Sequence, residues 1–100
     1  MLAFAPGTMA TALPTSKETA ITCGDLLDYV RLVNESNTVQ TVTTVDSNVE
    51  TPSEMGSIRL QPGEVMILWK RREFHKLYAS SAEVYGSGGM VRPTGLQERA

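Results

Sequence analysis

The stretch SIRLQPGEVMILW, residues 57–69, carries the strongest fold signal in the chain. Its centre, Gln61-Pro62-Gly63-Glu64, is typical of a type II turn, because proline fixes φ at about −65° and glycine accepts the positive φ of the third position. The residues on both sides, 57–60 and 65–69, are rich in the side chains that favour strands. We therefore predict an antiparallel hairpin across residues 57–69.

The second half of this stretch is apolar on both faces, which is typical of a strand in the centre of a core or of one covered on its outer side by a partner. Alternation places Val65, Ile67 and Trp69 on the same face. Because Trp69 is the only tryptophan of a small domain, we expect these three side chains to be buried together with Val30 and Leu32.

The rest of the chain also shows the period of strands. Residues 29–34 and 38–45 alternate and are separated by turn-forming residues, so they predict a second hairpin. Residues 46–56 are polar and predict a surface loop. Shorter strands are expected at 19–23, 76–79 and 83–85. Six to seven short strands joined by tight turns predict an all-β fold, a compact antiparallel β-sandwich or barrel with extended N- and C-terminal arms.

The two ends of the chain differ from this central part. We divide the chain into an extended N-terminal arm at 1–16, a β domain at 17–86 and a Gly-rich C-terminal tail at 87–100. The arm has no helical or strand period in its large apolar residues, so we expect them to dock on another chain rather than in a core of their own. These residues are Leu2, Phe4, Met9 and Leu13.

The composition argues against several classes of function. A formal net charge of −2 provides no overall field that would attract nucleic acid or an anionic membrane. One cysteine, Cys23, and one histidine, His75, cannot supply a zinc site, and no calcium or phosphate loop motif is present. No nucleophile and base, or pair of carboxylates, forms a recognisable catalytic motif. We predict a protein that is not an enzyme and binds neither a cofactor nor a metal.

One charged stretch, WKRREFHK at residues 69–76, allows two interpretations. We favour a solvated corner or a contact with a partner, in which Lys70, Arg71, Arg72 and Phe74 belong to the interface. The alternative is binding of single-stranded nucleic acid, where aromatic rings stack on bases while cations follow the phosphates.

Several segments, taken in order, resemble small and mostly uncharacterised proteins of tailed bacteriophages, especially cyanophages. The resemblance covers roughly residues 29–85. Its segments are Arg31-Leu32-Val33-Asn34, Val42 to Asp46, Gly56 to Leu60, Glu64 to Lys70 and Leu77 to Val84. This chain departs from the pattern at 71–74, where it has Arg-Arg-Glu-Phe.

The resemblance implies a virion structural protein with a small β fold, made in the host cytoplasm. It is similar to capsid decoration or cement proteins, which would bind the major capsid protein or other virion proteins in many copies or as a homo-oligomer. Many copies on a repeating lattice need only a modest interface each. The nearest alternative is an accessory protein of the neck, tail or fibre base, and the second alternative is a small nucleic-acid-binding β-barrel.

Overall fold

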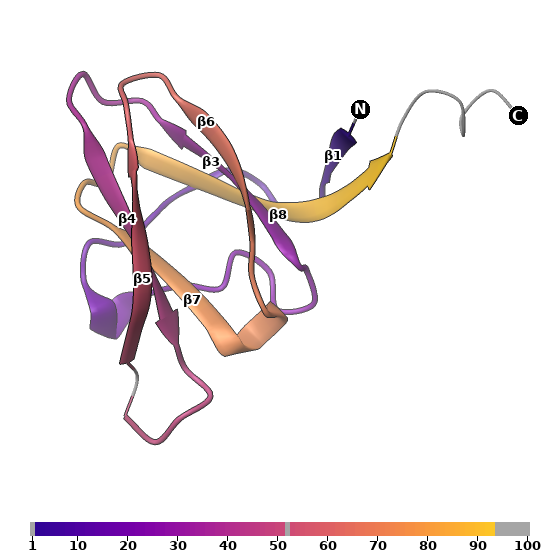
Figure 1. Cartoon of the computed structure of the whole chain (residues 1–100), viewed down its shortest axis with the longest axis vertical. Coiled ribbons are helices and arrows are strands. Elements are labelled where there is room, and N and C mark those ends of the chain that lie inside the picture. The colour runs from indigo at the N-terminus through magenta and orange to yellow at the C-terminus, as the bar shows by residue number, and fades with distance from the viewer. Residues whose placement is uncertain (1, 52, 94–100) are drawn as a thin grey trace, which may run out of the picture.

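A computed structural model describes residues 2–51 and 53–93 of the chain (Figure 1). It consists of strands and two short 3₁₀ helices. In order, these are β1 (Leu2–Pro6), β2 (Thr11–Ala12), η1 (Lys17–Thr19), β3 (Tyr29–Asn34), β4 (Gln40–Asp46), β5 (Ser53–Leu60), β6 (Val65–Trp69), η2 (Arg72–Phe74), β7 (His75–Ala79) and β8 (Val84–Pro93). The predicted all-β class is confirmed, with eight strands among the described residues instead of six to seven.

The strands form two antiparallel sheets. The first has the order β1-β8-β3-β6, with β2 also paired to β8, and the second has the order β5-β4-β7. A single bridge between Ile21 and Leu77 extends the second sheet beyond β7. This bridge and η1 replace the strand predicted at 19–23. From β2 onward, the chain changes sheet at every step except the β4–β5 hairpin, which is the winding of a double-sheet jelly roll.

Both predicted hairpins are wrong, although their strands are present. The turn at residues 61–64 forms, with Gly63 at a φ of 77° and the Glu64 N–H donating to the Gln61 carbonyl at 2.9 Å. It joins the two sheets, however, because β5 pairs with β4 while β6 pairs with β3. A Pro-Gly sequence therefore determines the turn but not which strands pair.

The connection from β3 to β4 also passes between the sheets, and the side chain of Asn34 stabilises it. Its buried side chain donates to the Thr38 carbonyl at 2.8 Å and to the Leu60 carbonyl at 2.9 Å. Its Oδ1 accepts hydrogen bonds from the backbone N–H and the hydroxyl of Ser36. The amide thus bonds carbonyls at this corner in addition to the backbone pairing of Asn34, and ties the corner to the end of β5.

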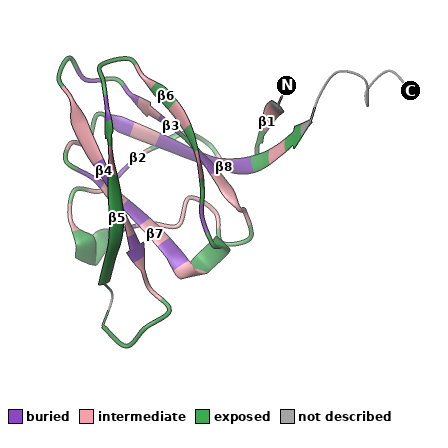
Figure 2. Ribbon diagram, viewed as in Figure 1, coloured by how far each residue is buried: buried purple, intermediate pink, exposed green. Residues whose placement is uncertain are grey.

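The core lies between the sheets, and Figure 2 shows the buried parts of β3, β7 and β8 in purple. Its members are Leu13, Val30, Leu32, Val42, Leu60, Leu77, Ala79 and Val84. The predicted burial of Val30 and Leu32 is confirmed. Met66 and Leu68 pack against this core from β6.

The predicted burial of Val65, Ile67 and Trp69 is wrong. Their exposed fractions are 46%, 44% and 57%. Because β6 is apolar at every position, its sequence does not determine which of its faces points inward. Nor is β6 a central strand, since it ends the first sheet.

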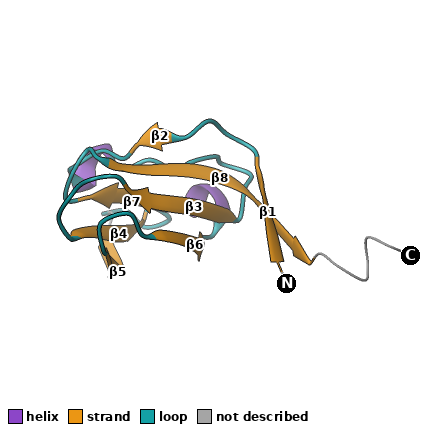
Figure 3. Cartoon of the chain, turned by 90° about the horizontal axis from the view of Figure 1, so that it is seen from above, coloured by secondary structure: helices purple, strands orange, loops and turns teal. Residues whose placement is uncertain are grey.

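Both predicted arms contribute strands to the first sheet. β1 pairs with the second half of β8, from Leu2 opposite Pro93 to Pro6 opposite Gly89. Figures 1 and 3 show this two-stranded ribbon projecting beyond the other strands. The boundary predicted at residue 87 therefore falls inside a strand, and the part of the predicted tail at 94–100 lies outside the described residues.

The Gly-rich run of β8 is explained by close packing rather than by flexibility. A methyl group at Gly88 would overlap the carbonyl oxygen of Cys23, and one at Gly89 would overlap Ala5 and the ring of Phe4. Glycine is needed here because other chain segments approach the strand closely.

Candidate protein-binding surface

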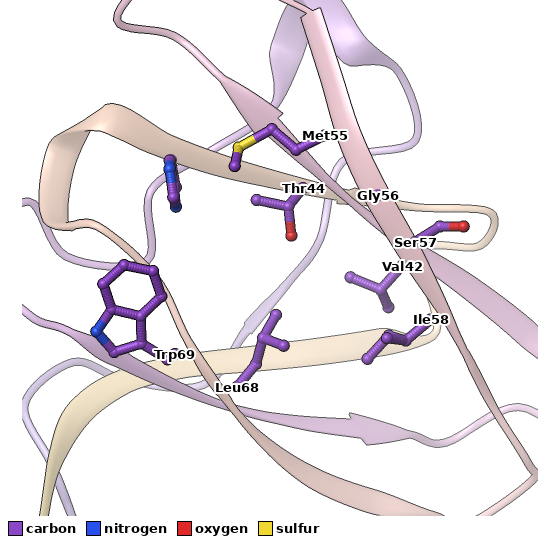
Figure 4. A pocket seen from close by; sticks show the side chains of 9 residues that line it. Val42, Thr44, Met55, Gly56, Ser57, Ile58, Leu68 and Trp69 are labelled. Atoms are coloured by element: carbon purple, nitrogen blue, oxygen red, sulfur yellow. The ribbon is translucent and has the colours of Figure 1, made fainter.

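An apolar groove lies where the two sheets part, between the end strands β5 and β6 (Figure 4). Its volume is about 320 Å³. Its apolar lining comes from three strands, with Val42 from β4, Met55 and Ile58 from β5, and Leu68 and Trp69 from β6. The groove has the apolar character of a site that takes up a hydrophobic side chain.

Met55 belongs to an irregularity in the β4–β5 ladder. Thr44 is opposite Gly56 and Val45 is opposite Glu54, so Met55 is the extra residue of a bulge. A bulge redirects side chains at the edge of a sheet, and Met55 lines the groove while 54% of its surface is exposed. Met55 has no signal in the sequence, because it lies in the polar stretch 46–56, which predicts a surface loop, whereas β5 begins at Ser53.

Trp69 and His75 form one wall of the groove. Their rings are in edge-to-face contact, with centroids 5.8 Å apart and an interplanar angle of 88°. His75 is buried, and its Nδ1 accepts a hydrogen bond from the Arg71 backbone N–H at 3.0 Å. This bond fixes the orientation of the imidazole ring, so the ring supports the indole as a rigid surface.

The exposed side of β6 continues the apolar surface away from the groove. Val65 is opposite Val33, and Ile67 is opposite Arg31, whose own side chain is exposed. Val65, Ile67 and Trp69 supply three of the large hydrophobic side chains that the described part of the chain exposes to solvent. Such a concentration on one strand is typical of an interaction surface.

The basic stretch at 69–76 does not form a common surface. Lys70 is fully buried, and its Nζ donates to the carbonyls of Gly24 and Arg72 at 2.8 Å each. Arg72 pairs with Asp28 at 3.2 Å. Arg71 lies over the Phe74 ring, 5.1 Å from its centroid. Of the four residues assigned to an interface, Lys70 is therefore corrected to the interior, because alternation after an exposed Trp69 turns it inward.

The apolar residues of the N-terminal segment are also placed differently from one another. Leu13 is only 1% exposed and belongs to the core of its own chain, so its assignment to a partner interface is corrected. Phe4 is half-buried in β1, and Met9 is 86% exposed in the loop before β2. The side chain of Leu2 lies outside what the structure describes.

Cys23 is partly buried against the core, close to Lys70. Burial raises the pKa of the Cys23 thiol to about 11, and the positive charge of Lys70 opposes this rise only in part. Burial likewise lowers the pKa of Lys70, while Cys23 and the carboxylates of Asp25 and Asp28 act in the opposite direction. The protonated thiol that results is a poor nucleophile and a poor metal ligand at neutral pH.

Among residues 2–51 and 53–93, no cluster of three or more His, Cys, Asp or Glu side chains is arranged to hold a metal ion. No helix in this part of the chain has the length and apolar character needed to cross a membrane.

Comparison of the chain with known protein families, characterised proteins and solved structures finds no match.

Proposed function

We propose that the chain is a non-enzymatic structural protein of a tailed-bacteriophage virion, most simply a decoration or cement protein that binds the major capsid protein in many copies. The proposal comes from the ordered sequence resemblance over residues 29–85. Jelly rolls occur among viral capsid proteins and also among lectins and enzymes, so the fold is compatible with this role without specifying it.

The observation that carries the proposal is the apolar groove between β5 and β6. Trp69 and Met55 leave more than half of their surfaces in solvent beside it, at 57% and 54% exposed. Covering such side chains stabilises a complex by about 25 cal/mol for each Å² of apolar surface removed from water. In this proposal, the groove takes up an apolar side chain of the capsid protein.

The projecting ribbon of β1 and β8 supplies a second contact. It reaches beyond the sandwich and exposes Met90, which is 52% exposed. A ribbon that extends past its own core is suited to crossing the boundary between neighbouring subunits. Avidity over a repeating lattice then multiplies a weak contact made by each copy.

The decisive experiment measures retention on purified particles. Met55→Asp places a charge in the groove at an exposed position, so it should greatly reduce binding while leaving the melting temperature close to that of the parent. The matched control is Val49→Asp, at a residue 46% exposed between β4 and β5. Equal retention of the two variants would contradict a docking role for the groove.

Copy number separates the two virion roles. Quantitative mass spectrometry of purified particles should find on the order of hundreds of copies for a capsid-coating protein and about a dozen for a ring at the neck or tail. A count of about a dozen would favour the neck, tail or fibre-base alternative.

The nucleic-acid-binding alternative has less support, because Lys70 is buried and Arg72 is paired with Asp28. It makes a clear prediction nonetheless. An electrophoretic shift at physiological salt, lost on combining Arg71→Ala with Arg72→Ala, would favour it over the virion roles.

A further inference from the structure

We propose that β6 is the pairing edge of a homodimer, in which the β6 strands of two copies lie antiparallel about a two-fold axis through Ile67. This inference goes beyond the proposed function, since it concerns the purified chain without any particle. The occupant of the edge is a second copy of the same chain.

The backbone of β6 has hydrogen-bonding groups directed at the free edge. The Glu64 carbonyl accepts from the Asn34 N–H at 3.1 Å, and the Lys70 N–H donates to the Asp28 carbonyl at 2.8 Å, so the even-numbered residues face β3. In an antiparallel ladder, the N–H and C=O of one residue point to the same side, and neighbouring residues point to opposite sides. Val65, Ile67 and Trp69 therefore direct their N–H and C=O groups away from β3.

Nothing in the sequence of β6 protects this edge. Proteins usually shield an edge strand with charges, proline or a bulge. The strand reads Val-Met-Ile-Leu-Trp and pairs with β3 in an unbroken register. By contrast, β5 ends the second sheet and carries Glu54, Arg59 and the bulge at Met55. Of these two strands, β5 is thus protected and β6 is open to pairing.

A two-fold axis through Ile67 makes the edge complementary to itself. Ile67 lies opposite Ile67 of the second copy, and Val65 lies opposite Trp69 of the second copy. All three are hydrogen-bonded positions, so about six main-chain hydrogen bonds join the strands. Their exposed apolar side chains meet on the outer face as cross-strand pairs, which stabilise a sheet.

The charges at the ends of β6 select the antiparallel arrangement and the second copy. Glu64 precedes the strand, and the exposed Arg71 follows the buried Lys70. The proposed register brings Glu64 of each copy opposite the buried Lys70 of the other and one residue from its exposed Arg71, so charges of opposite sign lie near each other at both ends of the paired strands. A parallel arrangement would place like charges together, which is unfavourable.

Sedimentation velocity of the full chain over a range of concentrations tests the proposal, and a monomer–dimer equilibrium is expected. Ile67→Lys places two ammonium groups across the axis and should raise the dimer dissociation constant by about tenfold or more. The control Met90→Lys changes an exposed residue of β8 and should leave the dimer intact. A chain that stays monomeric up to about 1 mM, or a dimer insensitive to Ile67→Lys, overturns the proposal.

A charge exchange tests the register and does not depend on an effect of any single variant on folding. Glu64→Arg and Arg71→Glu should each weaken the dimer by about fivefold, because each brings like charges near one another at both ends of the paired strands. Combining both substitutions restores opposite charges and should restore most of the affinity. Two single losses that simply add in the double variant would refute this register.

Oxidative cross-linking provides an independent readout of the axis. Ile67→Cys in a Cys23→Ala background places the new thiol opposite its own copy, within the range of separations that a disulfide spans. A cross-linked dimer is expected on mild oxidation, while Met90→Cys in the same background should remain monomeric on a denaturing gel. If Met90→Cys formed the cross-linked dimer and Ile67→Cys did not, the copies would associate through the β1–β8 ribbon, and pairing through β6 would be refuted. The sedimentation, charge-exchange and cross-linking results use the purified chain, so they do not depend on whether Met55→Asp reduces retention on particles.

Discussion

The Nζ of Lys70 donates a hydrogen bond to the carbonyl oxygen of Gly24 at 2.8 Å, across 46 residues of sequence. This contact fastens the end of β6 to the loop that leads into β3. The Arg72 carbonyl accepts a second hydrogen bond from the same ammonium, also at 2.8 Å. A buried cation is tolerated because it is hydrogen-bonded and lies near Asp25 and Asp28, which favour its charged form.

Replacing Lys70 should therefore destabilise the domain. Lys70→Met keeps most of the side-chain volume but leaves the Gly24 and Arg72 carbonyls without this donor, so a loss of about 2 kcal/mol in the free energy of unfolding is expected. The control is Lys17→Met, at an exposed residue of η1. Urea denaturation of both variants measures the difference. Equal midpoints for the two would show that Lys70 is a surface residue, as its sequence context first indicated.

The raised pKa of Cys23 makes stability depend on alkaline pH. The thiol ionises with a pKa of 9.0 in the unfolded chain and of about 11 in the folded protein. Between these values the folded state binds more protons, so the stabilisation is complete below about pH 9 and is lost as pH rises through about 11. The difference between the two pKa values corresponds to roughly 3 kcal/mol.

The lowered pKa of Lys70 has the opposite effect, because the folded protein then releases its proton before the unfolded chain does. A comparison with Cys23→Ala separates the two contributions. Stability curves of the parent and Cys23→Ala should converge between pH 9 and pH 11, with the parent falling more steeply. Parallel curves over this interval would place the thiol in solvent.

The sequence predicts strands better than it predicts their partners. The bounds of β3 and β6 match the predicted ranges, because polar turns on both sides delimit those runs. The wrong pairing has a physical cause, since a turn fixes only local dihedral angles, whereas strand pairing depends on contacts between residues far apart in the sequence, such as that of the buried Asn34 side chain with the Leu60 carbonyl.

The candidate site was less predictable, because it depends on which face of β6 points toward the core and on a bulge in β5. Five consecutive apolar residues do not indicate which of the two strand faces is buried. The exposure of Trp69 follows from the way β6 pairs with β3. The exposure of Met55 depends on an extra residue in the ladder opposite Thr44 and Val45. Neither feature has a local sequence signal.

Gly88 should be among the least replaceable residues of β8. Gly88→Ala places a methyl group onto the Cys23 carbonyl, and both groups belong to backbone that cannot move independently, so a loss of about 3 kcal/mol or more is expected. The matched control is Gly56→Ala in β5, where an added methyl group meets no atom within 4 Å. Thermal unfolding should leave this control unchanged or raise its stability by about 0.5 kcal/mol. A tolerated Gly88→Ala would mean that the loop at Cys23 lies further from β8.

The N-terminal segment contributes to the stability of the domain, whereas substitutions in a free arm would leave stability unchanged. Leu13 is 1% exposed within the core, and its N–H donates to the Val84 carbonyl at 2.8 Å. Leu13→Ala should therefore cost about 2 to 5 kcal/mol, because it opens a cavity beside Leu32 and Gly86. Met9→Ala, at an 86% exposed residue of the same segment, should change stability by no more than about 0.5 kcal/mol.

Deletion of residues 2–14 extends this test, since it also removes β1 and β2 and exposes the outer edge of β8. The truncated chain should melt well below the full chain, whereas removal of a mobile arm would leave the melting temperature unchanged. Deleting only residues 2–6 removes the projecting strand and spares Leu13, so its effect on melting should be the smaller of the two. If both truncated chains had the melting temperature of the full chain, Leu13 would have to lie outside the core. The N-terminal segment would then be an arm available to a partner.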